Sequence, residues 1–152
     1  MKKILLTLLL TSASVTHADC LLTAYADQGF WDIQKKAGGG WNFPSYDKLC
    51  EKLKKHDLGV GISTTSFITT QQTVASSTLR LYSNDIYKKY NLIVMTSLVT
   101  NSISANMERT TARQQTLVYD DVNNALEILA NGDEEFWNKN LNEIKNLKKN
   151  MK

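Results

Sequence analysis

Two cysteines, Cys20 and Cys50, constrain the fold of this chain more than any other feature of its sequence. An even number of cysteines in an exported protein is typical of disulfide bonding. Their separation excludes a Cys-X-X-Cys motif, so a catalytic redox pair is disfavoured, and two free thiols are the alternative. We therefore predict one disulfide that closes a loop of about 30 residues, a crosslink that stabilises a fold by roughly 3 to 4 kcal/mol in the chain-entropy model.

Export is predicted by residues 1–18. Two lysines precede an apolar run at residues 4–10, and Ala18 ends a motif of the kind that signal peptidase cleaves. The apolar run is shorter than the roughly 20 residues of a membrane span. We expect a cleaved signal peptide, a single domain at residues 19–152 and no stable membrane anchor after cleavage. A retained anchor and a lipoprotein are the alternatives.

The composition favours a bacterial envelope protein. A short signal with two lysines, together with many lysine and asparagine residues, indicates the periplasm as the expected compartment and secretion as the alternative. The full chain has a net charge of +3, and removal of the signal lysines leaves basic and acidic residues nearly balanced. Net charge therefore gives no indication of a nucleic-acid partner.

Three stretches of helical periodicity flank the middle of the chain. The first covers residues 45–56 and begins at Ser45, whose hydroxyl we expect to cap the helix. The other two, at about 111–130 and 133–149, have amphipathic stripes and are separated at Gly132, a residue that ends helices well. We predict one N-terminal helix and two C-terminal helices.

Between these helices the apolar residues follow a period of two, which is typical of strands. We predict strands at roughly 58–70, 73–83 and 91–104, with a hairpin connection at 83–91, because its Asn-Asp pair tolerates turn geometry. Apolar residues on both faces of the third strand predict a central, covered strand. Whether the segment before the first helix joins the sheet stays open.

The predicted fold class is α+β, with a small antiparallel sheet of about three to four strands and the helices packed on one face. The face rich in serine and threonine is expected to stay uncovered. Such a face could bind glycans or add a strand of a partner at its edge.

Catalytic and metal-binding motifs are scarce in this sequence. Outside the signal, His56 is the only histidine, at a predicted helix end, and no Gly-X-Ser-X-Gly motif is present. One histidine and two bonded cysteines leave no ligand set for zinc. We expect no enzyme activity, no metal and no cofactor. A glycan hydrolase is the alternative, and it would use two of these carboxylates: Asp27, Asp32, Asp47, Asp85, Glu108, Asp120 and Asp121.

Aromatic residues surround the glycine run at residues 38–40, which leads into the first predicted helix. One interpretation is a turn whose aromatic residues pack at the helix start. The other is an exposed aromatic loop, held by the disulfide, that anchors a partner. The candidate partner-binding residues are Trp31, Trp41, Phe43 and Tyr46.

The expected function is that of a non-catalytic exported protein that binds another macromolecule, with a protein as the partner. Its most concrete form is an inhibitor or immunity protein against a cell-envelope toxin or hydrolase. The alternatives are a structural or assembly component of an envelope machine and the carboxylate-based hydrolase. The lysine-rich C-terminus could also contact acidic lipid headgroups, although core packing explains its apolar stripe.

Overall fold

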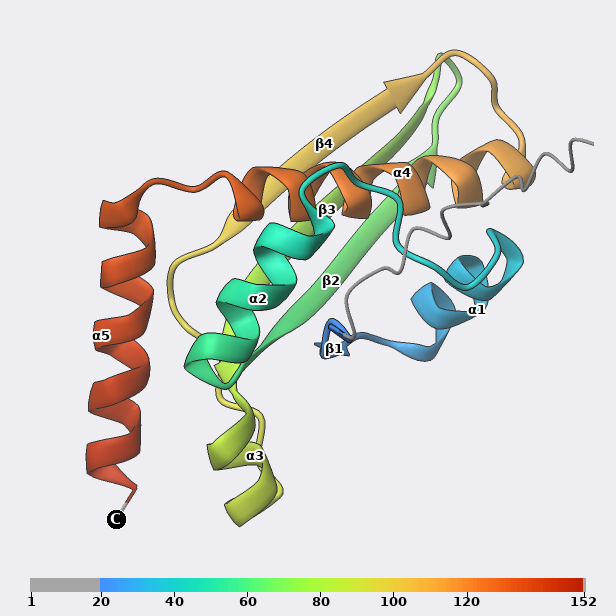
Figure 1. Cartoon of the computed structure of the whole chain (residues 1–152). Coiled ribbons are helices and arrows are strands. Elements are labelled where there is room, and N and C mark those ends of the chain that lie inside the picture. Colours follow the sequence, from blue (N-terminus) through green and yellow to red (C-terminus); the bar gives the residue numbers. More distant parts are fainter. Residues whose placement is uncertain (1–19, 152) are drawn as a thin grey trace, which may run out of the picture.

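A computed structural model of the chain describes residues 20–151, and the predicted signal peptide lies outside them. Four strands and five helices follow one another in the described part of the chain (Figure 1). In chain order these are β1 (Ala24–Tyr25), α1 (Gln28–Lys36), α2 (Tyr46–His56), β2 (Leu58–Ile68), β3 (Thr73–Ser83), α3 (Asn84–Tyr90), β4 (Thr100–Asn106), α4 (Thr111–Ala130) and α5 (Glu134–Asn150). The predicted α+β class is confirmed.

The strands form one sheet in the order β1-β2-β3-β4. The pairs β2–β3 and β3–β4 are antiparallel, whereas β1 pairs with β2 in parallel, with Ala24 opposite Val60. The sheet is therefore mixed: the three predicted strands pair antiparallel as expected, and β1 adds one parallel pair from the segment whose pairing the sequence did not decide. Two residues are too few to give β1 a periodic pattern, so the sequence did not show whether this segment joins the sheet.

Helix α4 packs across one face of the sheet, with α1 and α2 on the same side (Figure 1). Alternate residues of β3, including Ala75, Leu79 and Leu81, point into this layer and are buried. They meet the apolar stripe of α4, which includes Val122 and Leu126. The apolar stripe predicted for the long helix is therefore confirmed as the face that packs on the sheet.

One polar contact also joins α4 to the sheet. The fully buried Asp121 of α4 accepts hydrogen bonds through one carboxylate oxygen from the hydroxyls of Ser102 (2.8 Å) and Ser104 (2.7 Å) of β4. A buried carboxylate requires such donors, because burial without them is costly. These bonds fix β4 against the same helix that covers β3.

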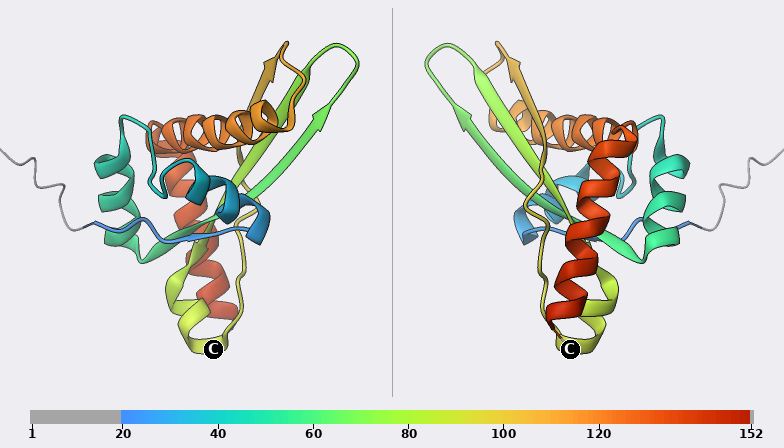
Figure 2. Two further views of the ribbon diagram at one scale, coloured as in Figure 1. Left: turned by 90° about the vertical axis from the view of Figure 1, so that its right-hand side faces the viewer. Right: turned by 90° about the vertical axis from the view of Figure 1, so that its left-hand side faces the viewer.

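Helix α5 stands at the side of the sheet and contacts α2 and the end of β3 (Figure 2). Its Trp137 is buried, and the ammonium nitrogen of Lys52 on α2 lies 4.3 Å from the centre of the indole ring. Beyond the helices, the hairpin end of β2 and β3 projects away from the rest of the molecule (Figure 2).

The segment 84–104 differs from the prediction. Residues 84–90 form helix α3, not a hairpin connection, because the Ser83 hydroxyl accepts a hydrogen bond from the Ile86 amide and caps the helix. Strand β4 covers only Thr100–Asn106 and is an edge strand. The apolar residues that predicted a central strand fall largely in an irregular segment before it.

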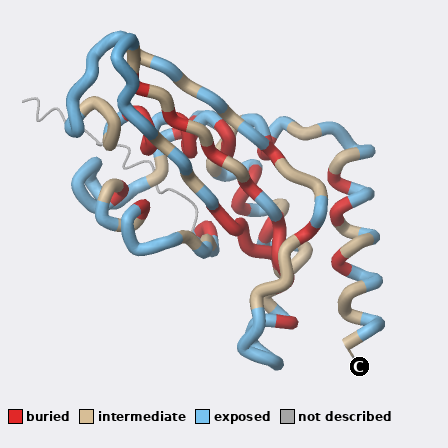
Figure 3. The backbone as a smooth tube through the Cα atoms, turned by 180° about the vertical axis from the view of Figure 1, so that it is seen from behind, coloured by how far each residue is buried: buried red, intermediate tan, exposed pale blue. Residues whose placement is uncertain are grey.

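This irregular segment runs beside β3, where Met95 forms an isolated antiparallel bridge with Tyr82 and the amide of Thr96 donates to the carbonyl of Leu81 (2.8 Å). The side chain of Met95 lies where a Cβ on Gly61 would be, and the ring of Tyr82 lies where a Cβ on Gly59 would be. Glycine at these two positions of β2 allows the close approach. Seen from behind, the strands are buried at this end and exposed toward the hairpin (Figure 3).

The disulfide between Cys20 and Cys50 is present, with the two Cα atoms 5.9 Å apart, as predicted. It indicates an oxidising, non-cytoplasmic compartment. None of the helices between residues 20 and 151 has the length and the apolar content that crossing a bilayer requires.

Candidate binding surfaces

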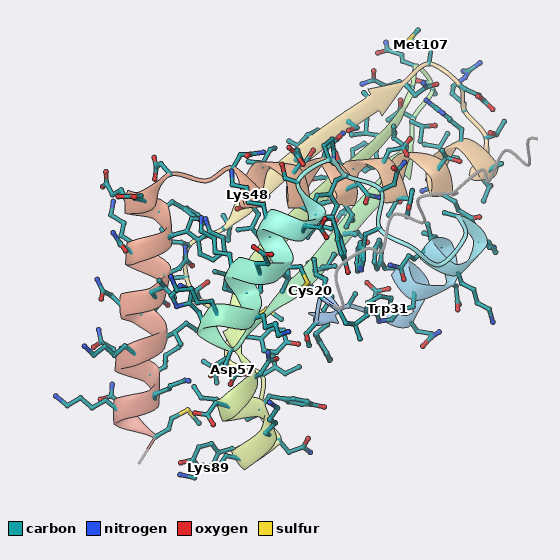
Figure 4. The ribbon with its side chains drawn as sticks, in the orientation of Figure 1. Cys20, Trp31, Lys48, Asp57, Lys89 and Met107 are labelled. Atoms are coloured by element: carbon teal, nitrogen blue, oxygen red, sulfur yellow. A yellow bond between two sulfur atoms is a disulfide. The ribbon has the colours of Figure 1, made fainter. Side chains whose placement is uncertain are left out.

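Two of the predicted aromatic residues lie together on the surface. Trp31 of α1 and Trp41 of the following loop have ring centres 6.2 Å apart, and both pack on the buried ring of Phe30. Both indoles are partly exposed, so they have free ring surface at the side of the molecule where Figure 4 shows Trp31. Their role in binding a partner remains a prediction.

The other two aromatic candidates form a separate pair, with the rings of Phe43 and Tyr46 5.7 Å apart. Phe43 is only 6 % exposed and belongs to the core, so the contacts of its ring are packing contacts. The Tyr46 hydroxyl donates a hydrogen bond to the carbonyl oxygen of Cys20 (2.9 Å). The structure therefore gives these two residues supporting positions beside the disulfide.

The loop after α1 is bonded to α4 along its length. The carbonyl of Gly40 accepts from the Tyr119 hydroxyl (3.1 Å), and the amide of Asn42 donates to the side chain of Asn123 (2.7 Å). These contacts support the interpretation of residues 38–45 as a turn into a helix. They also hold Trp41 in place.

The loop ends at Ser45, where the predicted cap is replaced by a contact with another helix. The hydroxyl of Ser45 donates to Glu127 of α4 (2.7 Å) and its amide donates to the same carboxylate (2.8 Å), while no side-chain capping bond forms. The Ser45 hydroxyl and amide lower the pKa of Glu127, because both bonds favour the charged carboxylate. The predicted capping role of Ser45 was therefore wrong.

A cavity of about 410 Å³ beside α1 contains two of the carboxylates considered for hydrolysis, Asp27 and Asp32. Asp27 caps α1 by accepting from the amide of Phe30 (3.0 Å), and Asp32 accepts from the side chain of Gln28 (2.9 Å). Both carboxylates thus take part in local contacts of the helix. Within residues 20–151, no cluster of three or more His, Cys, Asp or Glu side chains could hold a metal ion.

His56 lies at the end of α2, as predicted. Partial burial lowers its pKa, and the charges of Lys55 and Lys52 lower it further. The imidazole is therefore held in a basic environment at a helix end.

The sequence raised the addition of a partner strand at an edge of the sheet but did not identify β4 as that edge, because residues 91–104 predicted a central strand. No strand in the described part of the chain pairs with the outer edge of β4, whose sequence contains no charged residue and no proline. Natural edge strands are usually protected by such residues. Ile103, at the centre of β4, is 74 % exposed.

Apolar residues continue from β4 across the open face of the sheet, which is the face opposite to α4. Phe67, Val74 and Ala105 lie opposite one another on β2, β3 and β4, and Phe67 is half-exposed. An exposed apolar surface of this kind is typical of an interaction site. In the sequence, Ile103 belongs to the stretch 91–104, whose apolar residues on both faces predict a covered strand, so its exposure differs from that prediction.

A cavity of about 310 Å³ lies beside the first residues of β4. Thr100 and Asn101 of β4 form one wall, and Ile128 of α4 and Phe136 of α5 line the other side. Ile128 is 52 % exposed, although Leu126 and Leu129 beside it on α4 are buried. The edge of the sheet is thus flanked by a partly apolar cavity.

Comparison of the chain with models of protein families, with curated proteins and with solved structures gave no match.

Proposed function

We propose that this chain is a non-catalytic exported protein that binds another protein, and that the partner adds an extended strand to the outer edge of β4. The proposal is carried by one observation: β4 is an uncharged edge strand whose outer edge pairs with no strand within residues 20–151, and a partly apolar cavity lies beside it. In strand addition, backbone hydrogen bonds provide affinity, and pockets for alternate side chains provide specificity.

The chemistry of β4 defines the segment that would bind. A neutral strand gives no counter-charge to a charged side chain, so the partner segment is uncharged where it lies opposite residues 100–106. On the open face, an apolar or β-branched side chain would pack against Ile103. On the other face, an apolar side chain opposite Thr100 would enter the cavity toward Ile128.

An inhibitor or immunity protein against a cell-envelope toxin or hydrolase is the specific form of this function that we propose, with the periplasm as its compartment. The disulfide supports an oxidising compartment, and the Trp31–Trp41 pair offers a second contact surface. A component of an envelope assembly would use the same edge to bind a neighbouring subunit.

Selection of displayed random peptides on the oxidised protein tests the proposal. We expect the selected peptides to be extended, uncharged and alternately apolar, and to protect the amides of β4 from hydrogen exchange. Ile103→Lys and Ile128→Lys are expected to weaken binding at least tenfold, since both side chains are exposed and the folded state tolerates a charge there. Thr65→Lys, on the open face of β2, is the matched control and should retain binding.

Two results would contradict the proposal. Selected peptides could bind the two isoleucine variants as well as the wild type, or protect amides around Trp41 and not those of β4. The oligomeric state in solution, measured by sedimentation, provides a further check. If the wild type is a dimer and Ile103→Lys is a monomer, the edge of β4 binds a second copy of this chain and not a partner protein.

A further inference from the structure

A cavity of about 500 Å³ lies between α3 and the C-terminal half of α5, far from β4 in the fold. Lys89 and Tyr90 line it from α3, and three lysines of α5 line it from the other side: Lys145, Lys148 and Lys149. Figure 4 shows Lys89 at the end of the molecule opposite to Met107, which follows β4. The cavity therefore belongs to a different surface from the proposed strand-binding edge.

Two contacts hold the walls of this cavity together. Asp85 of α3 forms an ion pair with Lys148 at 3.3 Å, and the hydroxyl of Tyr90 donates to the carbonyl oxygen of Met151. One contact lies near each end of α3, so the helix is fixed against α5 at two points. The lysines are thus presented by a preformed surface.

The charge in the cavity is predominantly positive. Among the described residues, the one acidic side chain in its lining is Asp85, and it pairs with Lys148. Lys89, Lys145 and Lys149 form no ion pair within residues 20–151. Three ammonium groups therefore line one cavity without a described counter-ion.

The ends of the helices reduce this charge but do not cancel it. Both α3 and α5 end beside the cavity, and each C-terminus contributes a partial charge of about −0.5. The three unpaired lysines carry three positive charges and the two helix ends together contribute about −1, so a positive excess of about two charges remains. Lys145 lies outside the last turn of α5, so matching of the helix dipole does not account for its position.

We infer that the cavity between α3 and α5 is a binding site for a phosphate-bearing anion. A phosphate group carries up to two negative charges and several acceptor oxygens, and the compact ammonium of lysine is a common partner for it. The volume exceeds that of a bare phosphate, so the ligand is a free polyphosphate or the phosphate of a lipid headgroup. Both sources share the chemistry that the lysines recognise.

Lysines 89, 145 and 149 define the test. In the triple variant Lys89→Gln, Lys145→Gln and Lys149→Gln the cavity loses its unpaired charges. The triple variant Lys35→Gln, Lys36→Gln and Lys139→Gln removes the same charge from other surfaces of α1 and α5. Binding of inorganic pyrophosphate is followed by amide shifts in NMR spectra, and binding of phosphatidylcholine vesicles with and without phosphatidylglycerol is followed by cosedimentation.

We expect the wild type to bind at least one probe at 50 mM salt, with amide shifts centred on residues 85–90 and 145–149. The cavity variant should lose at least tenfold in affinity, and the control variant less than twofold. Binding of pyrophosphate identifies a soluble ligand, whereas binding of anionic vesicles alone identifies a headgroup. Equal losses in both variants, shifts elsewhere in the chain, or no binding of either probe would overturn the inference, provided that both variants unfold at the same urea concentration as the wild type.

Discussion

At the scale of single residues, the contact between Glu127 and Ser45 joins the loop before α2 to α4 and makes stability depend on pH. Two hydrogen bonds from Ser45 keep the pKa of Glu127 below its ordinary value of 4.5. Because the folded pKa is lower than the unfolded one, this stabilisation is complete above the ordinary value. It is lost as the pH falls through the folded pKa.

We therefore expect Glu127→Gln to lower the free energy of unfolding at pH 7 by about 0.5 to 1 kcal/mol, a modest effect because the pair is partly exposed. The difference from the wild type should shrink as the pH falls below 4.5. Urea unfolding at pH 7 and at pH 3 measures both quantities. Glu51→Gln is the control, since Glu51 is exposed on α2 and has no partner among the described residues. A difference that stays constant with pH would contradict the assignment.

At the scale of elements, strand β2 depends on two glycines with different neighbours. A Cβ on Gly59 would lie 2.3 Å from the ring of the buried Tyr82, whereas a Cβ on Gly61 would lie 2.4 Å from the terminal methyl of Met95. A thioether side chain can change its rotamers, but a buried ring has no room to move.

Gly59→Ala should therefore destabilise the fold by about 1 to 3 kcal/mol, and Gly61→Ala by clearly less. Thermal or urea unfolding of the two variants provides the comparison, and each serves as the control for the other. Equal decreases in the free energy of unfolding would mean that the strand conformation of the glycine, and not the neighbouring side chain, determines the destabilisation.

Elements with a long, regular pattern were predictable from the sequence. The predicted limits of α4 and β3 match the structure, and α2 differs by one residue, because a buried face imposes its period on the sequence. Helix α3 was not predictable in this way. Its seven residues begin with an Asn-Asp pair that suits a turn equally well, and only the capping contact of Ser83 distinguishes the two.

The candidate surfaces were predictable only in part, because exposure depends on neighbours that are distant in sequence. Trp31 and Trp41 meet because α1 and its following loop fold onto α4, which places them beside Phe30. Ile103 is exposed on β4, the outer strand of the sheet formed by residues 20–151, and strand order has no local sequence signal. The meeting of the lysines of α3 and α5 in one cavity also has no local sequence signal, because they lie more than 50 residues apart in the chain.

At the scale of the whole molecule, the disulfide joins the start of the described chain to the buried face of α2. The loop that it closes contains β1, α1 and the glycine run at residues 38–40, and its buried residues Leu22, Phe30 and Phe43 belong to the core. The crosslink therefore adds to the strand pairing and the contacts with α4 that also hold this segment.

The double variant Cys20→Ala and Cys50→Ala should have a free energy of unfolding lower than that of the oxidised wild type by roughly 3 to 4 kcal/mol. Urea unfolding under non-reducing conditions measures the difference. The reduced wild type is the control and should match the variant. A difference below about 1 kcal/mol would show that the segment before α2 is held mainly by its packing on α4.

The strands lie across the sheet in the order in which they occur in the chain. Each antiparallel strand pairs with the strand that immediately precedes or follows it, so most of the sheet is built from contacts of short sequence separation, and such topologies fold quickly. We expect the β2–β3 hairpin to nucleate folding, with β4 and α4 added by extension from it. The parallel contact of β1 then forms last, when the crosslinked segment closes over a sheet that is already assembled.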